Sequence, residues 1–169
     1  MNKASLAILV LAGFVSFNAF AQAKKSADSG IQGVWRMTER ETKGPNAGIN
    51  KNLQPNLYIF TRGHYSIVSV TSDKPRPNQP QDLAKATAAE LNATWGPFVA
   101  HSGTYEVKGE ILTLRPIVAK NPTVMTPGSA GAPAASSFKI DGKTLVLMPQ
   151  AVTQGPNLNV VSTRLTRVE

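Results

Sequence analysis

The chain has 169 residues, with 18 Lys and Arg against 10 Asp and Glu, a net charge of +8, two His and no Cys. This length is typical of a single domain, and 41% hydrophobic residues can bury a core, which excludes a disordered chain. The absence of Cys excludes a disulfide scaffold, a thiol nucleophile and a thiolate metal site.

The N-terminus has the pattern of a secretory signal peptide. A short positive start, Met1–Lys3, precedes an apolar run over Ala4–Phe17, and the small residues of Ala19–Ala23 fit an A-x-A cleavage site. The apolar run is shorter than the roughly 20 residues of a membrane span. We therefore expect residues 1–23 to be removed and residues 24–169 to form the domain. The mature protein would be periplasmic or secreted, with no integral membrane segment and a net charge of +7 from 17 basic and 10 acidic residues.

A first strand is predicted over Ile31–Thr42, and a hairpin follows it. In the hairpin, Leu57–Thr61 and His64–Val70 flank the turn pair Arg62-Gly63. The register places on the inward face Leu57, Ile59, Thr61, His64, Ser66, Val68 and Val70. The apolar side chains that would then point outward are Tyr58, Phe60, Tyr65 and Ile67. A helix over Gln81–Trp95, with apolar residues at helical spacing, is expected to cover them.

Two further hairpins repeat one pattern. Residues 104–116 align without a gap to residues 137–149, and each copy places an x-Gly pair between two runs of alternating polarity. With that turn, Tyr105 lies opposite Leu112, and Phe138 lies opposite Leu145. The inward faces become Tyr105, Val107, Leu112, Leu114 and Phe138, Ile140, Leu145, Leu147. One wet face and one apolar face are typical of antiparallel sheet.

A last strand over Leu158–Val168 brings the count to eight strands and one helix. Sequential hairpins favour an all-β, eight-stranded antiparallel up-and-down barrel with the helix inserted mid-chain, because closure removes exposed strand edges. A two-sheet sandwich is the alternative. The interior of an eight-stranded barrel holds either side chains or one small ligand.

The chain resembles bacterial lipocalin-like domain proteins, members of the calycin-like β-barrels. Gly33-Val34-Trp35 in the first strand and Arg164 to Arg167 in the last resemble the lipocalin pattern, in which a Trp closes the barrel base under a basic side chain. Residues 55–61, 63–66 and 103–107 also look like this family. The resemblance implies a small-molecule cavity and a closure formed by Trp35 with Arg167 or Arg164. Two departures are the mid-chain helix and the missing Cys pair.

The candidate ligand-binding residues are Thr61, His64, Ser66, Tyr105, Leu112, Phe138 and Leu145. The three polar residues could anchor a ligand in an otherwise apolar cavity, or His64 could be solvated at the rim or hydrogen-bonded in the core. The four apolar residues could line a cavity or fill a core. His101 is predicted to lie in a loop after the helix.

Motifs for catalysis, metal binding and cofactor binding are absent from the sequence. There is no G-x-S-x-G, no H-E-x-x-H and no glycine-rich phosphate loop. The two His lie far apart in sequence without nearby carboxylates, which is poor evidence for a metal site. The basic residues are scattered and do not form the pattern of a nucleic-acid groove. The positive net charge therefore indicates weak attraction to an anionic envelope surface rather than nucleic-acid binding.

Three functions follow. The first is binding of a small, largely apolar molecule in a cavity reached from the barrel end near residues 126–135. The second is a barrel enzyme of isomerase or cyclase type, which requires a buried His64 with a polar partner. The third is an envelope interaction module that uses the outward Tyr58, Phe60, Tyr65 and Ile67.

Overall fold

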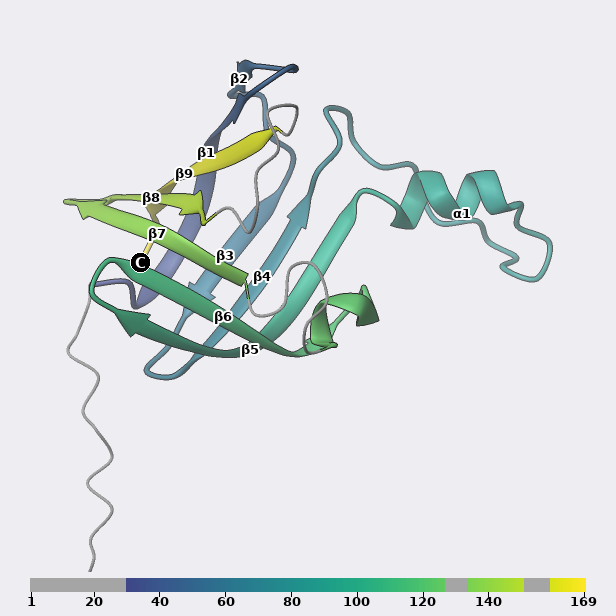
Figure 1. The fold of residues 1–169 in the computed structure, drawn as a ribbon. Coiled ribbons are helices and arrows are strands. Elements are labelled where there is room, and N and C mark those ends of the chain that lie inside the picture. Colours follow the sequence, from purple (N-terminus) through teal and green to yellow (C-terminus); the bar gives the residue numbers. More distant parts are fainter. Residues whose placement is uncertain (1–29, 127–133, 151–158) are drawn as a thin grey trace, which may run out of the picture.

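The chain folds into a closed antiparallel β-barrel with a helical arm at one side (Figure 1). The computed structural model describes residues 30–126, 134–150 and 159–169. Its elements are β1 (Gly33–Lys43), β2 (Gly48–Asn50), β3 (Asn56–Phe60), β4 (His64–Val70), α1 (Ala88–Trp95), β5 (Phe98–Lys108), β6 (Ile111–Ala119), the 3-10 helix η1 (Pro122–Met125), β7 (Ala134–Asp141), β8 (Thr144–Pro149) and β9 (Val160–Arg167). The predicted signal peptide, residues 1–23, lies outside the described residues, as does most of the predicted loop at residues 126–135.

Strand pairing follows chain order around the barrel. The order is β2-β1-β3-β4-β5-β6-β7-β8-β9, and β1 also pairs with β9. Because β2 pairs only with Arg40–Thr42 at the end of β1, the closed ring within the described residues consists of the eight strands β1 and β3–β9. The predicted up-and-down barrel with a mid-chain helix is confirmed, and the sandwich alternative is wrong.

The two repeated hairpins have the predicted inward faces but a different register. Tyr105 pairs with Leu114, and Phe138 pairs with Leu147, rather than with Leu112 and Leu145. The turns are centred one residue later than predicted, because Gly109 and Gly142, with φ of 58° and 54°, take the first turn position. A shift of two residues in register preserves the face of every side chain, since strand side chains alternate with period two.

The predicted faces of the β3–β4 hairpin are wrong, although its register is right. Phe60 pairs with Tyr65 as expected, yet the buried side chains are Tyr58, Phe60, Tyr65, Ile67 and Ser69. Leu57, Thr61, His64 and Val68 are exposed on the outer face, and Ser66 is half-buried there. The larger aromatic side chains face inward because they bury more apolar surface than Thr61, His64 and Ser66 would.

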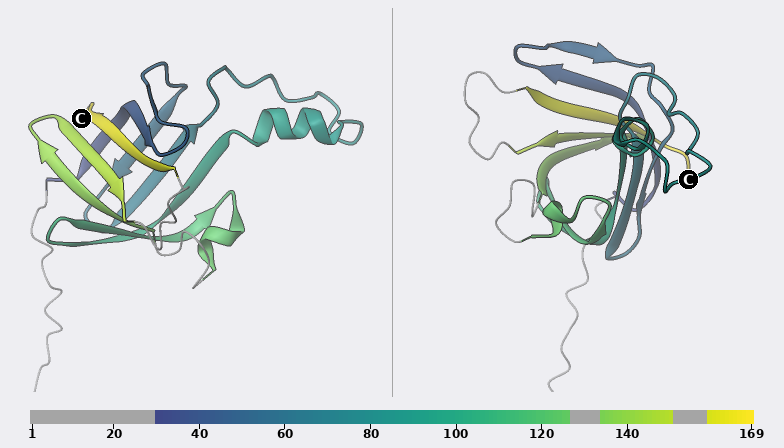
Figure 2. Two further views of the ribbon diagram at one scale, coloured as in Figure 1. Left: turned by 45° about the horizontal axis from the view of Figure 1, so that its top comes forward. Right: turned by 90° about the vertical axis from the view of Figure 1, so that its right-hand side faces the viewer.

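Helix α1 begins later than predicted and covers neither face of that hairpin. Thr87 caps it: the Glu90 backbone N–H donates to Thr87 Oγ1 (3.2 Å), and the Thr87 N–H donates to Glu90 Oε2 (2.8 Å). Figures 1 and 2 show the helix to one side, beyond the ends of β4 and β5. The outward aromatic patch of the interaction hypothesis therefore does not exist, because those four side chains lie in the core.

The barrel interior divides into two halves. The closed half is the end that contains Trp35 and the three hairpin turns, and it is filled by the buried side chains Trp35, Phe60, Leu112, Phe138, Leu145 and Leu165. The open half is the opposite end, from which α1 and η1 emerge. By strand alternation, the inner positions of the open half include the polar residues Arg40, Asn56, Ser69, His101, Ser136 and Thr163 and the apolar residues Val99 and Val161.

Trp35 lies at the base of the closed half. Its side chain is 0% exposed, and the indole Nε1 donates to the Ile31 carbonyl (2.8 Å). The guanidinium carbon of Arg167 lies 4.1 Å from the ring centroid, and its Nη1 and Nη2 donate to the carbonyls of Gln32 and Gly30 (2.5 Å each). Arg167 therefore ties the last strand to the segment that enters the first. Arg164 lies on the outer face instead, 3.6 Å from Glu39.

Candidate functional site

A tyrosine–histidine pair lies on the inner face where the two halves meet. Tyr65 on β4 and His101 on β5 occupy adjacent strands, and Tyr65 Oη is 2.9 Å from His101 Nδ1. Their rings meet edge to face, with centroids 5.4 Å apart. The Tyr65 ring belongs to the closed-half core while its hydroxyl reaches the open half, so the polar contact sits directly on the apolar floor.

Burial favours the neutral form of both members of this pair. It raises the pKa of Tyr65 to about 12 and lowers the pKa of His101 below its usual value, because desolvation disfavours the charged form of each group. With the imidazole proton on Nε2, Nδ1 accepts from the Tyr65 hydroxyl, and Nε2–H remains as a donor. In this tautomer the pair offers one oriented hydrogen-bond donor, His101 Nε2–H, at the floor of the open half.

A β-bulge determines which charges face the interior. The β1–β9 register shifts between Met37 and Glu39, so Thr38 is an extra residue and alternation reverses after it. Glu39 then faces outward, where Arg164 and Lys51 contact it (3.6 Å and 3.3 Å), and Arg40 faces inward. By the same alternation, no strand carboxylate among the described residues lies on the inner face of the open half.

Arg40 contributes a positive charge to this half. It lies close enough to Tyr58 to oppose slightly the effect of burial, which raises the pKa of Tyr58 to about 12. Its guanidinium also donates to the Thr71 carbonyl (3.5 Å) and lies 4.0 Å from Asp73. A groove of about 400 Å³ runs past Arg40 and Thr42 toward Asn50 and Asp73, so inner-face residues of the open half are reached from outside the barrel.

Asn56 bridges β1 and β3 beyond the end of their ladder. β1 pairs with β3 only over Gly33–Trp35. Beyond that point Asn56 replaces the ladder: its Oδ1 accepts from the Met37 N–H (2.6 Å), and its Nδ2 donates to the Met37 carbonyl (3.3 Å). The backbone groups of Met37 are satisfied, and β1 is free to diverge from β3.

The three polar candidates from the sequence lie on the outside of the barrel. His64 is exposed at the hairpin turn, and its carbonyl accepts from the Thr61 N–H (2.8 Å). The Ser66 hydroxyl accepts from Ser102 Oγ on the neighbouring strand (2.9 Å). The predicted inward orientation of Thr61, His64 and Ser66 is thus wrong, and the barrel-enzyme hypothesis loses the buried His64 that it requires.

The four other candidates do face inward, in the closed half. Leu112, Phe138 and Leu145 are buried in the core, and Tyr105 packs edge to face on Phe60, with centroids 5.4 Å apart. The Tyr105 hydroxyl donates to the Thr61 carbonyl (2.6 Å). A ligand role for these residues remains a prediction, and the structure assigns them to the packed floor beneath the open half.

His101 is the residue that sequence reasoning missed. It lies on β5 rather than in a loop, because β5 begins at Phe98, well before the repeated pattern. The cue was available: His101 has the same parity as Tyr105 and Val107, so extending the alternation backward from the hairpin places it on the inner face.

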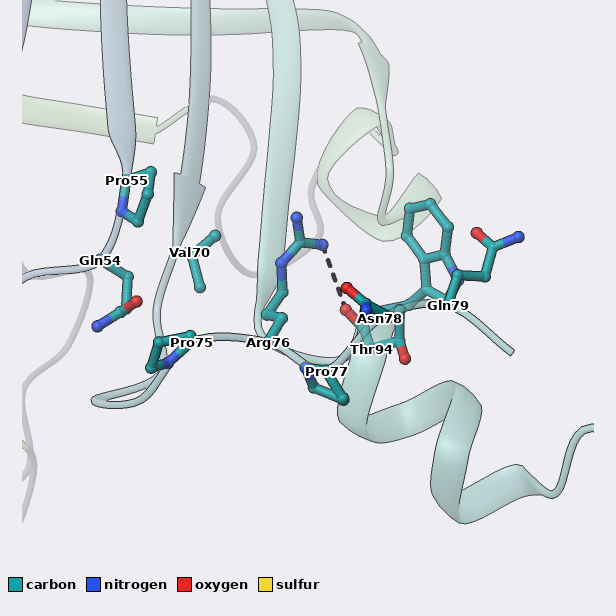
Figure 3. A pocket seen from close by; sticks show the side chains of 10 residues that line it. Gln54, Pro55, Val70, Pro75, Arg76, Pro77, Asn78, Gln79 and Thr94 are labelled. Carbon is teal, nitrogen blue, oxygen red and sulfur yellow. Dashed lines mark hydrogen bonds between the residues drawn. The ribbon is translucent and has the colours of Figure 1, made fainter. Parts of the chain in front are cut away.

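A larger groove, of about 550 Å³, lies outside the barrel at its rim (Figure 3). It forms where the proline-rich segment at residues 75–79 passes the end of α1. Arg76 joins the two: its Nη1 donates to the Thr94 carbonyl (3.2 Å), and its guanidinium carbon lies 4.6 Å from the centroid of the Phe98 ring.

The described residues contain no group of three or more His, Asp or Glu placed to hold a metal ion. In the same ranges, none of the helices has the length and apolarity that crossing a membrane requires.

No protein-family model matches the chain, and no curated protein matches it either. Among solved structures, it is similar to a lipocalin-like protein from Bacteroides uniformis, with 11% identity and a TM-score of 0.46, over 80% of this chain and 96% of that one. It is also similar to an uncharacterized protein from Bacteroides eggerthii, with 9% identity and a TM-score of 0.43, over 80% and 98% of the two chains. The barrel assignment itself rests on the strand pairings of this chain.

Proposed function

We propose that this protein binds a small, largely apolar molecule in the open half of its barrel, with a polar acceptor group of the ligand at His101. The observation that carries the proposal is the Tyr65–His101 pair, a neutral, oriented hydrogen-bonding unit on an apolar floor. Small-molecule sites commonly combine apolar walls with a few placed polar groups.

The surrounding charges support a ligand that accepts hydrogen bonds. Arg40 faces the open half while Glu39 is turned outward by the bulge at Thr38. A carboxylate in this position would compete with the ligand for His101 and would repel electron-rich groups. The groove beside Arg40 and Thr42 offers a route of entry.

Native mass spectrometry of the protein purified from its own cells tests this function. We expect an added mass that is lost on denaturation. Tyr65→Phe, which removes one hydroxyl, and His101→Ala should lower the bound fraction. His64→Ala is the matched control, because His64 is exposed on the outer face. Absence of any bound molecule, or equal loss in the His64 variant, would contradict the proposal.

We also propose that the protein is exported and works in the periplasm or outside the cell. The support is the sequence of residues 1–23, with its positive start, apolar run and small residues before Lys24. The intact mass of the protein from an envelope fraction should correspond to residues 24–169. A mass that includes residues 1–23 would contradict cleavage.

A further inference from the structure

The rim groove is a second candidate site, separate from the barrel interior. Val70 and Phe98 pair on adjacent strands, and alternation puts both on the outer face of the barrel. Val70 lines the groove, and the cation–π contact of Arg76 with Phe98 holds the proline-rich segment beside α1. The groove volume of about 550 Å³ is within the range of small-molecule sites.

One wall of the groove presents an aromatic ring in a fixed position. Trp95 is 41% exposed, and its ring meets Phe98 edge to face, with centroids 6.1 Å apart. Its carbonyl accepts from Lys120 Nζ, and the next residue, Gly96, closes the helix by donating to the Asn92 carbonyl (2.8 Å). An exposed indole held from both the backbone and the ring side is a preformed stacking surface.

The polar lining consists mainly of amide side chains. Three amide side chains, Gln54, Asn78 and Gln79, line the groove with Arg76, which is its single charged lining residue. Amides both donate and accept hydrogen bonds. Thr94 also lines the groove; it is 5% exposed, and its Oγ1 is a buried polar atom without a hydrogen-bond partner in the described structure. Such an atom in a native site calls for an explanation.

We infer that this groove binds a saccharide that carries a carboxylate, such as a uronic acid residue. The apolar C–H face of a sugar ring stacks on the Trp95 indole. Its hydroxyl groups both donate and accept, as the three amides do. Its carboxylate meets Arg76, whose guanidinium has five N–H donors. The absence of any acidic residue from the groove lining removes the repulsion that would otherwise act on this group.

Fluorescence quenching by acrylamide tests the inference on the whole chain. Of the two tryptophans, Trp35 is 0% exposed and Trp95 is 41% exposed, so quenching reports on Trp95. We expect trigalacturonic acid to protect the emission in a saturable way. The neutral maltotriose should bind at least about tenfold more weakly, and citrate, an anion without a sugar ring, should give no protection.

Variants locate the effect. Asn78→Ala keeps the fluorophore and should weaken trigalacturonate binding severalfold. Gln150→Ala, an exposed amide at the end of β8, is the matched control and should leave binding unchanged. His101→Ala should also leave it unchanged, which separates this site from the barrel proposal. Absence of saturable protection, equal affinity for maltotriose, or equal losses in the Asn78 and Gln150 variants would overturn the inference.

Discussion

The two halves of the barrel interior are built from the same eight strands but from opposite kinds of side chain. Toward the closed end, β9 contributes Leu165, which is fully buried, and toward the open end its next inner residue is the half-buried Thr163. β4 changes in the same direction, from the aromatic Tyr65 to the small Ser69. In these two strands the closed end therefore contributes a large apolar side chain, and the open end contributes a smaller polar one.

This difference would separate stability from the proposed ligand binding within one sheet. Large apolar side chains fill the closed half, so substitutions there create cavities. The inner positions of the open half hold polar side chains together with smaller apolar ones such as Val99 and Val161, whose loss exposes less new apolar surface. We therefore expect mutations in the two halves to differ in kind: closed-half variants should lower the free energy of unfolding, and open-half variants should change ligand binding.

Trp35→Ala should have the largest effect on stability. It removes a fully buried indole together with its hydrogen bond to Ile31 and its contact with Arg167. We expect a loss of about 3–5 kcal/mol in the free energy of unfolding, measured by urea denaturation. Trp95→Ala is the matched control and should cost much less, because that ring is partly exposed. A loss below about 1 kcal/mol for the Trp35 variant would mean that the base does not close the barrel.

Two truncations on one strand compare the halves directly. Leu165→Ala, in the closed half, should cost about 2–5 kcal/mol. Thr163→Ala, two residues along the same inner face in the open half, should change stability by less than about 1 kcal/mol. Both values come from the same denaturation series. Similar losses for the two variants would show that the open half is packed as the closed half is, and would count against a binding site there.

The two C-terminal arginines give a smaller contrast. Arg167→Met removes the cation over Trp35 and the two bonds to the carbonyls of Gln32 and Gly30. We expect a loss of about 1–3 kcal/mol. Arg164→Met removes an ion pair with Glu39 at a side chain that is 51% exposed, and such pairs contribute about 0–1 kcal/mol. Equal thermal shifts for the two variants would mean that the stack on Trp35 adds nothing.

Sequence reasoning predicted the barrel because its hairpins can be recognised from local sequence patterns. The x-Gly turns and period-two alternation around Gly109 and Gly142 give both the strands and their inward faces. It failed on the β3–β4 hairpin because both faces there are apolar, so alternation alone does not select one. Comparing side-chain size would have done so: Phe60 and Tyr65 face inward, and the smaller Thr61 and Ser66 do not.

Most of the candidate site could not be predicted from the sequence. The inward position of Arg40 depends on the bulge at Thr38, and no residue type or spacing in β1 marks that bulge. The Tyr65–His101 contact joins residues from strands separated by a long insertion that contains α1. Alternation alone places His101 on the inner face, but only the pairing of Ile67 with His101 brings its side chain next to Tyr65, and pairing between non-local strands cannot be deduced from local patterns.

Protonation of His101 should give the smallest effect on stability. It also tests whether His101 is buried where the two halves meet. Burial lowers the pKa of His101, so the unfolded chain binds its proton more readily than the folded chain. Stability should therefore fall as pH drops below about 6.5, the usual value for unfolded His, and level off below the folded-state pKa.

The change is measured by denaturation at a series of pH values, for the natural chain, His101→Gln and His64→Gln. The dependence below about pH 6.5 should weaken in the His101 variant and persist in the His64 variant, whose substituted side chain is exposed. The affinity for a ligand that accepts a hydrogen bond from His101 Nε2 should depend on the same titration. Protonation turns Nδ1 into a donor that faces the Tyr65 hydroxyl, so the bond that orients the imidazole must rearrange. A pH profile unchanged by His101→Gln would place that histidine outside the low-dielectric floor, and with it the polar anchor of the proposed site.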